Sequence, residues 1–244
     1  MRLALGQVGV EGVPAIWDTS IRPHGLVVGQ TGAGKTQLAR VLIGQAREAG
    51  EVWIGDGKGG DDFESVFSDS FASGPTEVVA MLDRLADEVE RRMDRIRRLG
   101  TESADLRPLL CVVDELAAVQ LRRRVEDVKA ARDRKERMQA SLAEVALTGR
   151  SAKVSLLVLL QRPDADAIPG AVRDQLGLRI ALGWMSADGY RMVFGTTDLQ
   201  PPSCLDPGNG WISGHDGHRD QPRLFRASAV TVAPHRYGRT LGGV

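Results

Sequence analysis

The sequence has few aromatic residues, almost no cysteine and no long apolar run. Its longest uninterrupted apolar stretches, such as 156–160, have five residues, whereas a membrane-spanning helix needs roughly 20. The first residues, "MRLALGQVGVEG", also lack the apolar core of a signal peptide. These absences argue against direct membrane insertion and against secretion, so we expect a cytoplasmic chain.

Cysteine and net charge are equally scarce. The two cysteines, Cys111 and Cys204, have neither the spacing of a metal site nor that of a disulfide framework, and we interpret both as bystanders. The 32 basic and 32 acidic residues cancel, which neither requires nor excludes a polyanionic partner. A nucleic-acid partner therefore cannot be inferred from the net charge.

Length and hydrophobic pattern predict one large α/β domain. A chain of 244 residues can bury a full core but is short for two comparable domains. Short apolar strands are expected at 25–29, 51–55, 109–115, 154–160 and 178–183, and helices at 35–49, 75–99, 116–149 and 186–194. This alternation is typical of a parallel sheet with helices on both faces.

The two ends of the chain differ from this core. Residues 1–24 contain "RLALGQ" and "VPAIWD", which favour a short hairpin, and the sequence becomes rich in turn residues from Pro201. We expect one domain over 1–244. In it, 1–24 is a lead-in hairpin, 25–200 is the core and 201–244 is a closing β edge and tail.

The stretch "GQTGAGKT", 29–36, matches the phosphate-loop pattern G-x-x-x-x-G-K-[ST] in full, directly after a strand and at the start of a helix. Its glycines allow backbone N–H groups to turn toward phosphates, and the helix N-terminus favours negative charge. We expect Lys35 to reach the β- and γ-phosphates of ATP and Thr36 to be a Mg²⁺ ligand. The expected nucleotide-binding residues are Gly29, Gln30, Thr31, Gly32, Ala33, Gly34, Lys35, Thr36 and Gln37.

The stretch "LLCVVDEL" is an apolar strand with two acids at its C-terminal end, the edge at which open α/β sheets bind ligands. Asp114 is expected in the Mg²⁺ shell. Glu115 is expected to orient and deprotonate the water that attacks the γ-phosphate. The alternative, that the two acids only cap the following helix, stays open.

The order of the strands narrows the class of ATPase. A complete strand, "EVWIG", lies in the sequence between the phosphate-loop strand and the Asp114 strand, and a later strand ends in the polar Gln161. This layout is typical of the RecA-like additional-strand ATPases with a catalytic glutamate, the ASCE class. We expect Gln161 between the two carboxylate-bearing strand ends, where it would position the γ-phosphate and water. A solvated strand end is the alternative.

Several stretches together resemble the motor domain of the FtsK/SpoIIIE family of DNA translocases, which includes conjugative transfer proteins of actinobacterial elements. The resemblance covers almost all of the chain. It rests on "LALGQVGVEGVPAIWD", "HGLVVGQTGAGKT", "IGDGKGG", "VVDELA", "GRSAKVSLLVLLQRP" and "RIALGWMSADGYRMVFG". The order of "DELA", "GRSA" and "QRP" is more specific than the phosphate loop alone.

The resemblance implies a ring, expected to be a hexamer, with ATP between subunits and double-stranded DNA in the central channel. It places the family's arginine finger, which completes the site of a neighbouring subunit, at Arg150, with Arg179 as the second choice. It places contacts to DNA phosphates at Arg173 and Arg191. An ordinary surface charge is the alternative for these arginines.

Three features stay outside this interpretation. Lys58, between glycines, either reaches toward the nucleotide or a neighbouring subunit or belongs to a simple glycine-rich turn. The segment 121–139 carries eight basic and four acidic residues, which fits a solvated helix face or a contact to DNA or an adjacent subunit.

The family's membrane-spanning and winged-helix parts are not in this sequence. We therefore expect a bare motor, an excised piece, or a small mobile-element version that uses separate partners.

The sequence thus predicts a Mg²⁺- and ATP-dependent motor that moves double-stranded DNA in conjugative transfer or chromosome segregation, with partner proteins that recruit it to DNA or to a membrane. Its catalytic residues are expected to be Lys35, Glu115, Gln161 and Arg150. Two alternatives stay open. One is a type VII secretion-like ATPase that acts on protein, and the other is a nucleotide-binding assembly module with weak hydrolysis.

Overall fold

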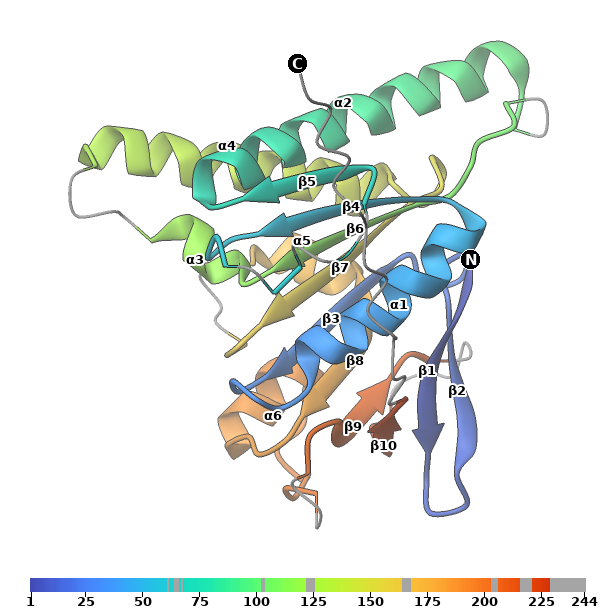
Figure 1. Cartoon of the computed structure of the whole chain (residues 1–244), viewed down its shortest axis with the longest axis vertical. Helices are drawn as coiled ribbons and strands as arrows, with labels where there is room; N and C mark the ends of the chain where they lie inside the picture. Colours follow the sequence, from blue (N-terminus) through green and yellow to red (C-terminus); the bar gives the residue numbers. More distant parts are fainter. Residues whose placement is uncertain are drawn as a thin grey trace, which may run out of the picture.

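The computed structural model describes residues 1–60, 62–63, 66, 68–101, 104–121, 126–163, 168–202, 206–215 and 221–228. Within these ranges, ten strands form one sheet in the order β2-β1-β10-β9-β8-β3-β7-β6-β4-β5 (Figure 1). The strands are β1 (Arg2–Val8), β2 (Val13–Asp18), β3 (His24–Gly29), β4 (Glu51–Asp56), β5 (Ser70–Ser73), β6 (Leu109–Asp114), β7 (Val154–Leu160), β8 (Leu176–Leu182), β9 (Asn209–Ser213) and β10 (Arg223–Ala227).

Six strands, from β5 to β8 in the sheet order, run parallel. Every residue of β3, β6 and β7 is buried, as expected for central strands that are covered on both faces. β7 lies between β3 and β6, so one strand separates the phosphate-loop strand from the strand that ends in Asp114. This is the predicted additional-strand arrangement.

The remaining four strands pair antiparallel and extend the sheet beyond β8. The predicted hairpin at the start of the chain is β1 and β2. The closing strands differ from our expectation in one respect, because they do not form the edge of the sheet. β9 pairs with β8 and β10 pairs with β1, which leaves β2 at the edge.

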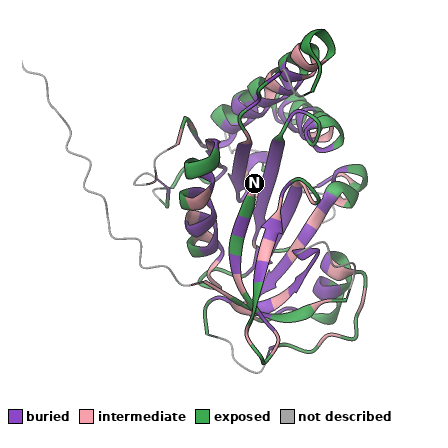
Figure 2. Cartoon of the chain, turned by 90° about the vertical axis from the view of Figure 1, so that its right-hand side faces the viewer, coloured by how far each residue is buried: buried purple, intermediate pink, exposed green. Residues whose placement is uncertain are grey.

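Helices cover both faces of the sheet (Figures 1 and 2). α1 packs on one face, where Leu42 joins a cluster with Val27 of β3. α2 and α4 pack on the other face, where Leu85 and Leu142 join a cluster with Val158 of β7. The helices are α1 (Lys35–Ala49), α2 (Pro75–Leu99), α3 (Leu116–Gln120), α4 (Val128–Thr148), α5 (Gly170–Gln175) and α6 (Ala187–Phe194). Among the described residues, no helix is long and apolar enough to cross a membrane.

The expected helix over 116–149 is two helices, α3 and α4. The guanidinium of Arg134 on α4 donates to the carbonyls of Val119 and Leu121 at 2.9 and 2.8 Å and pairs with Glu126. It therefore satisfies backbone carbonyls at the end of α3 that a continuous helix would have bonded internally. This tertiary contact explains the break.

Two expectations concern residues outside the described part of the chain. These are Cys204 and the three arginines at 122–124 in the charged segment 121–139. Cys111, in contrast, is buried in β6, and burial raises the pKa of its thiol to about 12. A thiol of this kind is an inert packing group, as expected for a bystander.

Candidate nucleotide-binding site

The phosphate loop joins β3 to α1 in a conformation that only glycine adopts readily at two positions. Gly32 has φ +83° and Gly34 has φ +101°, in the region of backbone space that excludes most side chains. Gly34 is also the N-cap residue of α1. The first turn of the helix therefore faces the loop with its N–H groups, which is the arrangement that binds phosphate in P-loop proteins.

Lys35 begins α1 and folds back over the loop. Its Nζ donates to the carbonyl of Gly29 at 2.7 Å and to that of Gln30 at 3.2 Å. The side chain is largely buried, and burial lowers its pKa, an effect that the carboxylates of Asp114 and Glu115 partly oppose. A cation held by carbonyls at this point is already placed for a bound phosphate.

The turn that leads into β9 also contacts the phosphate loop. The N–H of Gly208 donates to the carbonyl of Ala33 at 2.9 Å. A Cβ atom on Gly34 would lie 2.9 Å from the nitrogen of Gly208, and Pro207 lines the nucleotide cavity. Sequence reasoning missed this contact, because Pro207 and Gly208 belong to a turn-rich segment far from the loop in the sequence.

Asp114 and Glu115 stand where β6 ends, beside the phosphate loop. Both are 8% exposed. Burial raises the pKa of Asp114 to about 6, although Lys35 acts in the opposite direction. Glu115 has φ +51° and is the N-cap of α3, with no hydrogen bond from its side chain to that helix. The side chain of Glu115 is thus not used as a helix cap.

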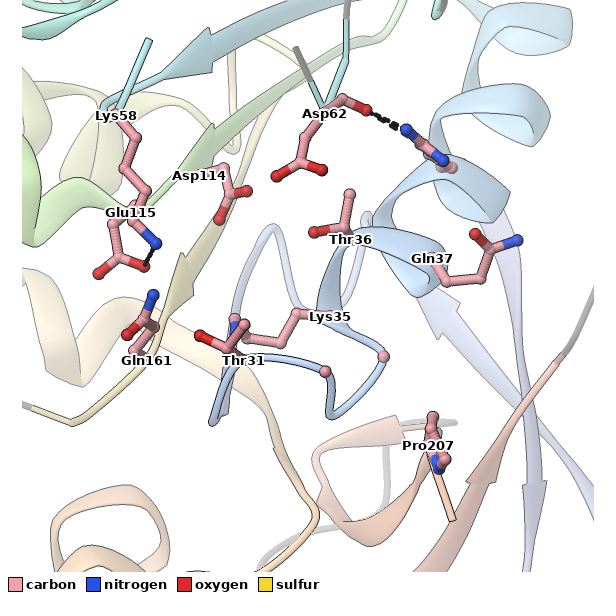
Figure 3. Close-up of a pocket in the computed structure, with 13 residues that line it drawn as sticks. Thr31, Lys35, Thr36, Gln37, Lys58, Asp62, Asp114, Glu115, Gln161 and Pro207 are labelled. Atoms are coloured by element: carbon pink, nitrogen blue, oxygen red, sulfur yellow. Dashed lines mark hydrogen bonds and ion pairs between the residues drawn. The ribbon is translucent and has the colours of Figure 1, made fainter. Parts of the chain in front are cut away.

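One cavity of about 370 Å³ brings these groups together (Figure 3). Gln161 enters it from the end of β7 and extends toward Glu115. Because β7 lies between β3 and β6, Gln161 stands between the phosphate loop and the acids rather than between two carboxylate-bearing strands. The cavity is lined by Thr31, Gly32, Gly34, Lys35, Thr36, Gln37, Arg40, Lys58, Asp62, Asp114, Glu115, Gln161 and Pro207.

Three of the predicted nucleotide-binding residues do not line this cavity: Gly29, Gln30 and Ala33. Their carbonyls instead accept the hydrogen bonds that shape the loop, from Lys35 and from Gly208. Besides Pro207, two further lining residues were not predicted, Arg40 and Asp62. Arg40 Nε donates to the carbonyl of Asp62 at 3.1 Å. The spacing of Arg40, four residues after Thr36 on one helix face, is the signal that could have revealed it.

The donors present fit a hydrated Mg²⁺ ion. Thr36 and Asp114 face each other across the cavity. Among the described residues, no group of three or more histidine, cysteine, aspartate or glutamate side chains could hold a metal by itself. Mg²⁺ commonly retains waters and binds one or two protein oxygens together with substrate phosphates. A hydroxyl and a carboxylate beside a phosphate loop suit that mode of binding.

Arg150 lies at the opposite end of β7 from Gln161. It is exposed, and its Nε donates to the carbonyl of Ser20 at 3.1 Å. β7 has seven residues, so roughly 23 Å of strand separate the two ends. Arg150 therefore cannot reach the nucleotide cavity of its own chain.

Arg179, the second choice, has a structural role within the chain. Its guanidinium donates to the carbonyls of Leu176, Val193 and Arg173 at 3.0, 2.9 and 3.2 Å. These bonds tie β8 to α5 and α6. A side chain that stabilises three segments in this way is poorly suited to reach another subunit, which favours Arg150.

The two predicted DNA contacts lie on two short helices, α5 immediately before β8 in the sequence and α6 after it. Arg191 on α6 has a side chain that is 61% exposed, and it pairs with Asp188 at 2.8 Å. Arg173 on α5 is half-buried and donates to the carbonyl of Ile168 at 3.2 Å. Arg191 is the more accessible of the two for a phosphate.

No protein-family model matches the chain, but several curated proteins do. It is 28% identical over 207 residues to the FtsK domain-containing protein YdcQ of Bacillus subtilis, and the match covers 81% of this chain and 42% of YdcQ. It is 31% identical over 230 residues to the ESX-4 secretion system protein EccC4 of Mycobacterium tuberculosis (82% and 17%). It is 28% identical over 218 residues to the DNA translocase SftA of Bacillus subtilis (78% and 21%). The chain spans less than half the length of each of these relatives.

A solved structure shares this fold. The monomer form of the pCW3 conjugation coupling protein TcpA, solved with ATPγS, superposes with a TM-score of 0.78 over 93% of this chain and 66% of that chain, at 23% identity. Fold and site together define a P-loop ATPase domain of the additional-strand class. Together with this fold and site, the relatives named above make the chain similar to the motor domains of the FtsK/SpoIIIE family.

Proposed function

We propose that this chain is the ATP-hydrolysing motor domain of a DNA translocase. The observation that carries the proposal is the cavity in which a complete phosphate loop meets Asp114, Glu115 and Gln161. In this proposal Lys35 and the loop bind the phosphates, and Thr36 and Asp114 hold Mg²⁺, which supplies charge neutralisation at the transferring phosphate. Glu115 orients and deprotonates the attacking water, and Gln161 positions the water and the γ-phosphate.

The motion of DNA is proposed from the relatives. SftA is named a DNA translocase and TcpA a conjugation coupling protein. We propose a hexameric ring in which Arg150 completes a neighbour's site and Arg191 and Arg173 contact DNA phosphates. Phosphate contacts carry no sequence information, so the motor would move double-stranded DNA of any sequence, in conjugation or chromosome segregation. Partner proteins that recruit the ring to DNA or to a membrane belong to the same proposal.

A second candidate is a motor that acts on protein. It is favoured by the 31% identity to EccC4, which is named a secretion system protein. The chemistry at the nucleotide would be the same in both cases, so the site does not separate the two candidates. They differ in the polymer that should accelerate hydrolysis.

The test is the steady-state rate of ATP hydrolysis with and without long double-stranded DNA at low salt, where phosphate contacts are strongest. A DNA translocase should hydrolyse ATP several-fold faster with duplex DNA, and Lys35→Met should abolish both rates. Binding and hydrolysis of ATP without any response to DNA, and without DNA binding, would contradict the DNA proposal and favour the protein motor. Binding without hydrolysis would leave an assembly module.

A further inference from the structure

Lys58 forms an ion pair with Glu115 inside the nucleotide cavity. Its Nζ lies 3.2 Å from Oε2 of Glu115, and the two side chains are 52% and 10% exposed (Figure 3). Both residues line the same cavity as Lys35 and Thr36. The cavity therefore has two lysines, of which Lys35 contacts the phosphate loop and Lys58 contacts the expected general base.

The backbone around Lys58 is fixed by one buried carboxylate. Asp56, which is 3% exposed, ends β4. It accepts the N–H groups of Lys58, Gly59 and Gly60 at 2.9, 3.2 and 2.7 Å. A turn with three such bonds to one side chain has little freedom to move. The backbone of Lys58 is thus held in place. Its half-exposed ammonium group can still move between neighbouring negative charges.

The other half of the pair is attached to the same turn. The N–H of Gly57 donates to the carbonyl of Asp114 at 2.9 Å. A Cβ atom on Gly57 would lie 2.5 Å from the carbonyl oxygen of Glu115, so only glycine permits this approach. Asp56 and Asp114 are paired across β4 and β6. Lys58 and Glu115 therefore project from two adjacent strand ends that are locked in register.

The ion pair of Lys58 with Glu115 reduces the repulsion between Glu115 and a bound triphosphate. Asp114 and Glu115 are both buried beside a loop that is built to receive phosphates. A triphosphate brings several negative charges close to Glu115, and like charges repel one another strongly in a partly buried site. A cation paired with Glu115 reduces that repulsion and restrains the carboxylate.

We propose that Lys58 is a positioning residue, which pairs with Glu115 so that the general base and the γ-phosphate can occupy one cavity. This rests on the proposed function, because it requires that ATP binds there. Lys58 acts through Glu115 and not by replacing Lys35 as the phosphate ligand. A half-exposed ion pair contributes little to folding, so removing Lys58 should leave the stability of the fold nearly unchanged.

A double-mutant cycle on nucleotide affinity tests this role without relying on turnover. The dissociation constant of ATPγS with Mg²⁺ is measured by calorimetry for the native chain, Lys58→Met, Glu115→Gln and the double variant. Lys58→Met should weaken binding about tenfold when Glu115 is charged, equivalent to about 1.4 kcal/mol. The same change should cost less than about threefold in the Glu115→Gln background, where the repulsion is absent.

Matched variants complete the experiment. Lys58→Arg keeps the positive charge and should retain nearly native affinity, whereas Lys58→Gln should behave like Lys58→Met. Lys129→Met removes an exposed lysine that does not line the cavity and should change nothing. Thermal melts confirm that each variant is folded.

Two results would overturn the proposal. An equal loss of affinity in both backgrounds would mean that Lys58 binds the phosphates directly, and no loss in either would make it an ordinary surface lysine. If the native chain itself does not bind ATPγS, the proposed function fails, and the positioning role fails with it. That outcome is distinct from a native chain that binds nucleotide without regard to Lys58.

Discussion

Gly34 and Gly208 meet where the phosphate loop contacts the turn that leads into β9. The position that a Cβ atom on Gly34 would take lies 2.9 Å from the nitrogen of Gly208, whose N–H donates to Ala33. The loop is therefore shaped from both sides, by its own glycines and by a segment more than 170 residues later in the chain. Small changes at this junction should affect nucleotide binding more than global stability.

A pair of glycine substitutions on one helix tests this. Gly34→Ala should weaken ATPγS binding by about tenfold or more, because the left-handed conformation and the contact with Gly208 both exclude a side chain. Gly44, in the exposed face of α1, has nothing within 4 Å of the position that a methyl group would take. Gly44→Ala should leave binding unchanged and raise the free energy of unfolding by about 0.5–1 kcal/mol. Calorimetry and urea unfolding give the two quantities.

The role of Glu115 predicts a separation of binding from catalysis. Glu115→Gln should bind ATPγS at least as tightly as the native chain and hydrolyse ATP roughly 10²-fold more slowly or worse, because the amide cannot accept the proton of the attacking water. Lys35→Met should lose binding itself. A Glu115→Gln variant with near-native hydrolysis would exclude Glu115 as the general base.

Arg150 should act only between subunits. Because its side chain is exposed and lies at the far end of β7, Arg150→Ala should fold normally and bind nucleotide normally but hydrolyse ATP roughly 10²-fold more slowly or worse in the assembled ring. Mixing it with Lys35→Met should restore part of the activity. In a mixed ring, some interfaces join the intact Lys35 of one subunit to the intact Arg150 of its neighbour. Arg97→Ala, which removes an exposed arginine from α2, is the matched control. Equal rates for Arg150→Ala and the native chain would refute the finger assignment.

Arg191 should contribute to DNA affinity without contributing to sequence preference. Arg191→Ala is expected to weaken duplex binding several-fold for every sequence and to reduce the dependence of affinity on salt. Asp188→Asn removes its ion-pair partner and should strengthen binding slightly. Fluorescence anisotropy at several salt concentrations measures both effects. Unchanged binding for Arg191→Ala would exclude α6 from the DNA surface.

Because the imidazole of His24 is buried, we expect the folded chain to lose stability in mild acid. Burial lowers the pKa of its imidazole to about 4 from an ordinary value of 6.5, and its Nδ1 accepts the N–H of Leu156 at 3.0 Å. Between these pH values the unfolded chain binds a proton that the folded chain does not, so the free energy of unfolding falls as pH falls from 6.5 to about 4. The loss attributable to this group is on the order of 3 kcal/mol.

The control for this prediction keeps the hydrogen bond and removes the titration. His24→Asn retains an acceptor for Leu156 but does not ionise, so its free energy of unfolding should fall less over the same pH window. Urea unfolding at about pH 7, 6 and 5 measures the difference between the two chains. Parallel losses in both would show that other groups dominate the acid response.

The parts of this protein that the sequence predicted well depend on local signals. The central strands are apolar along their whole length, and the phosphate loop and the acids at 114–115 are short motifs whose context fixes their place at one edge of a sheet. The fold class, the similarity to FtsK/SpoIIIE motor domains and the position of Gln161 at this edge followed from these signals. The predicted roles of the individual residues stay predictions.

The features that sequence reasoning missed depend on tertiary contacts. At the break between α3 and α4, the guanidinium of Arg134 donates to backbone carbonyls at the end of α3. The place of β10 inside the sheet arises from its pairing with β1, across most of the chain. The ion pair of Lys58 and Glu115 joins two strand ends that only the sheet order brings together. Neither propensity nor spacing contains this information.

The pairing of β1 with β10 also affects how the chain must fold. Among the described strands, the hairpin of β1 and β2 joins the rest of the sheet through β10 alone. Gln45 of α1 is a further contact, because its side chain accepts the N–H of Ala4 at 2.7 Å. During synthesis β1 therefore leaves the ribosome long before its second partner strand, β10, has been made. The N-terminal hairpin can pack against α1 early, but it can pair with β10 only after residues 223–227 have been synthesised. Completion of the sheet is therefore a late step that joins distant parts of the sequence.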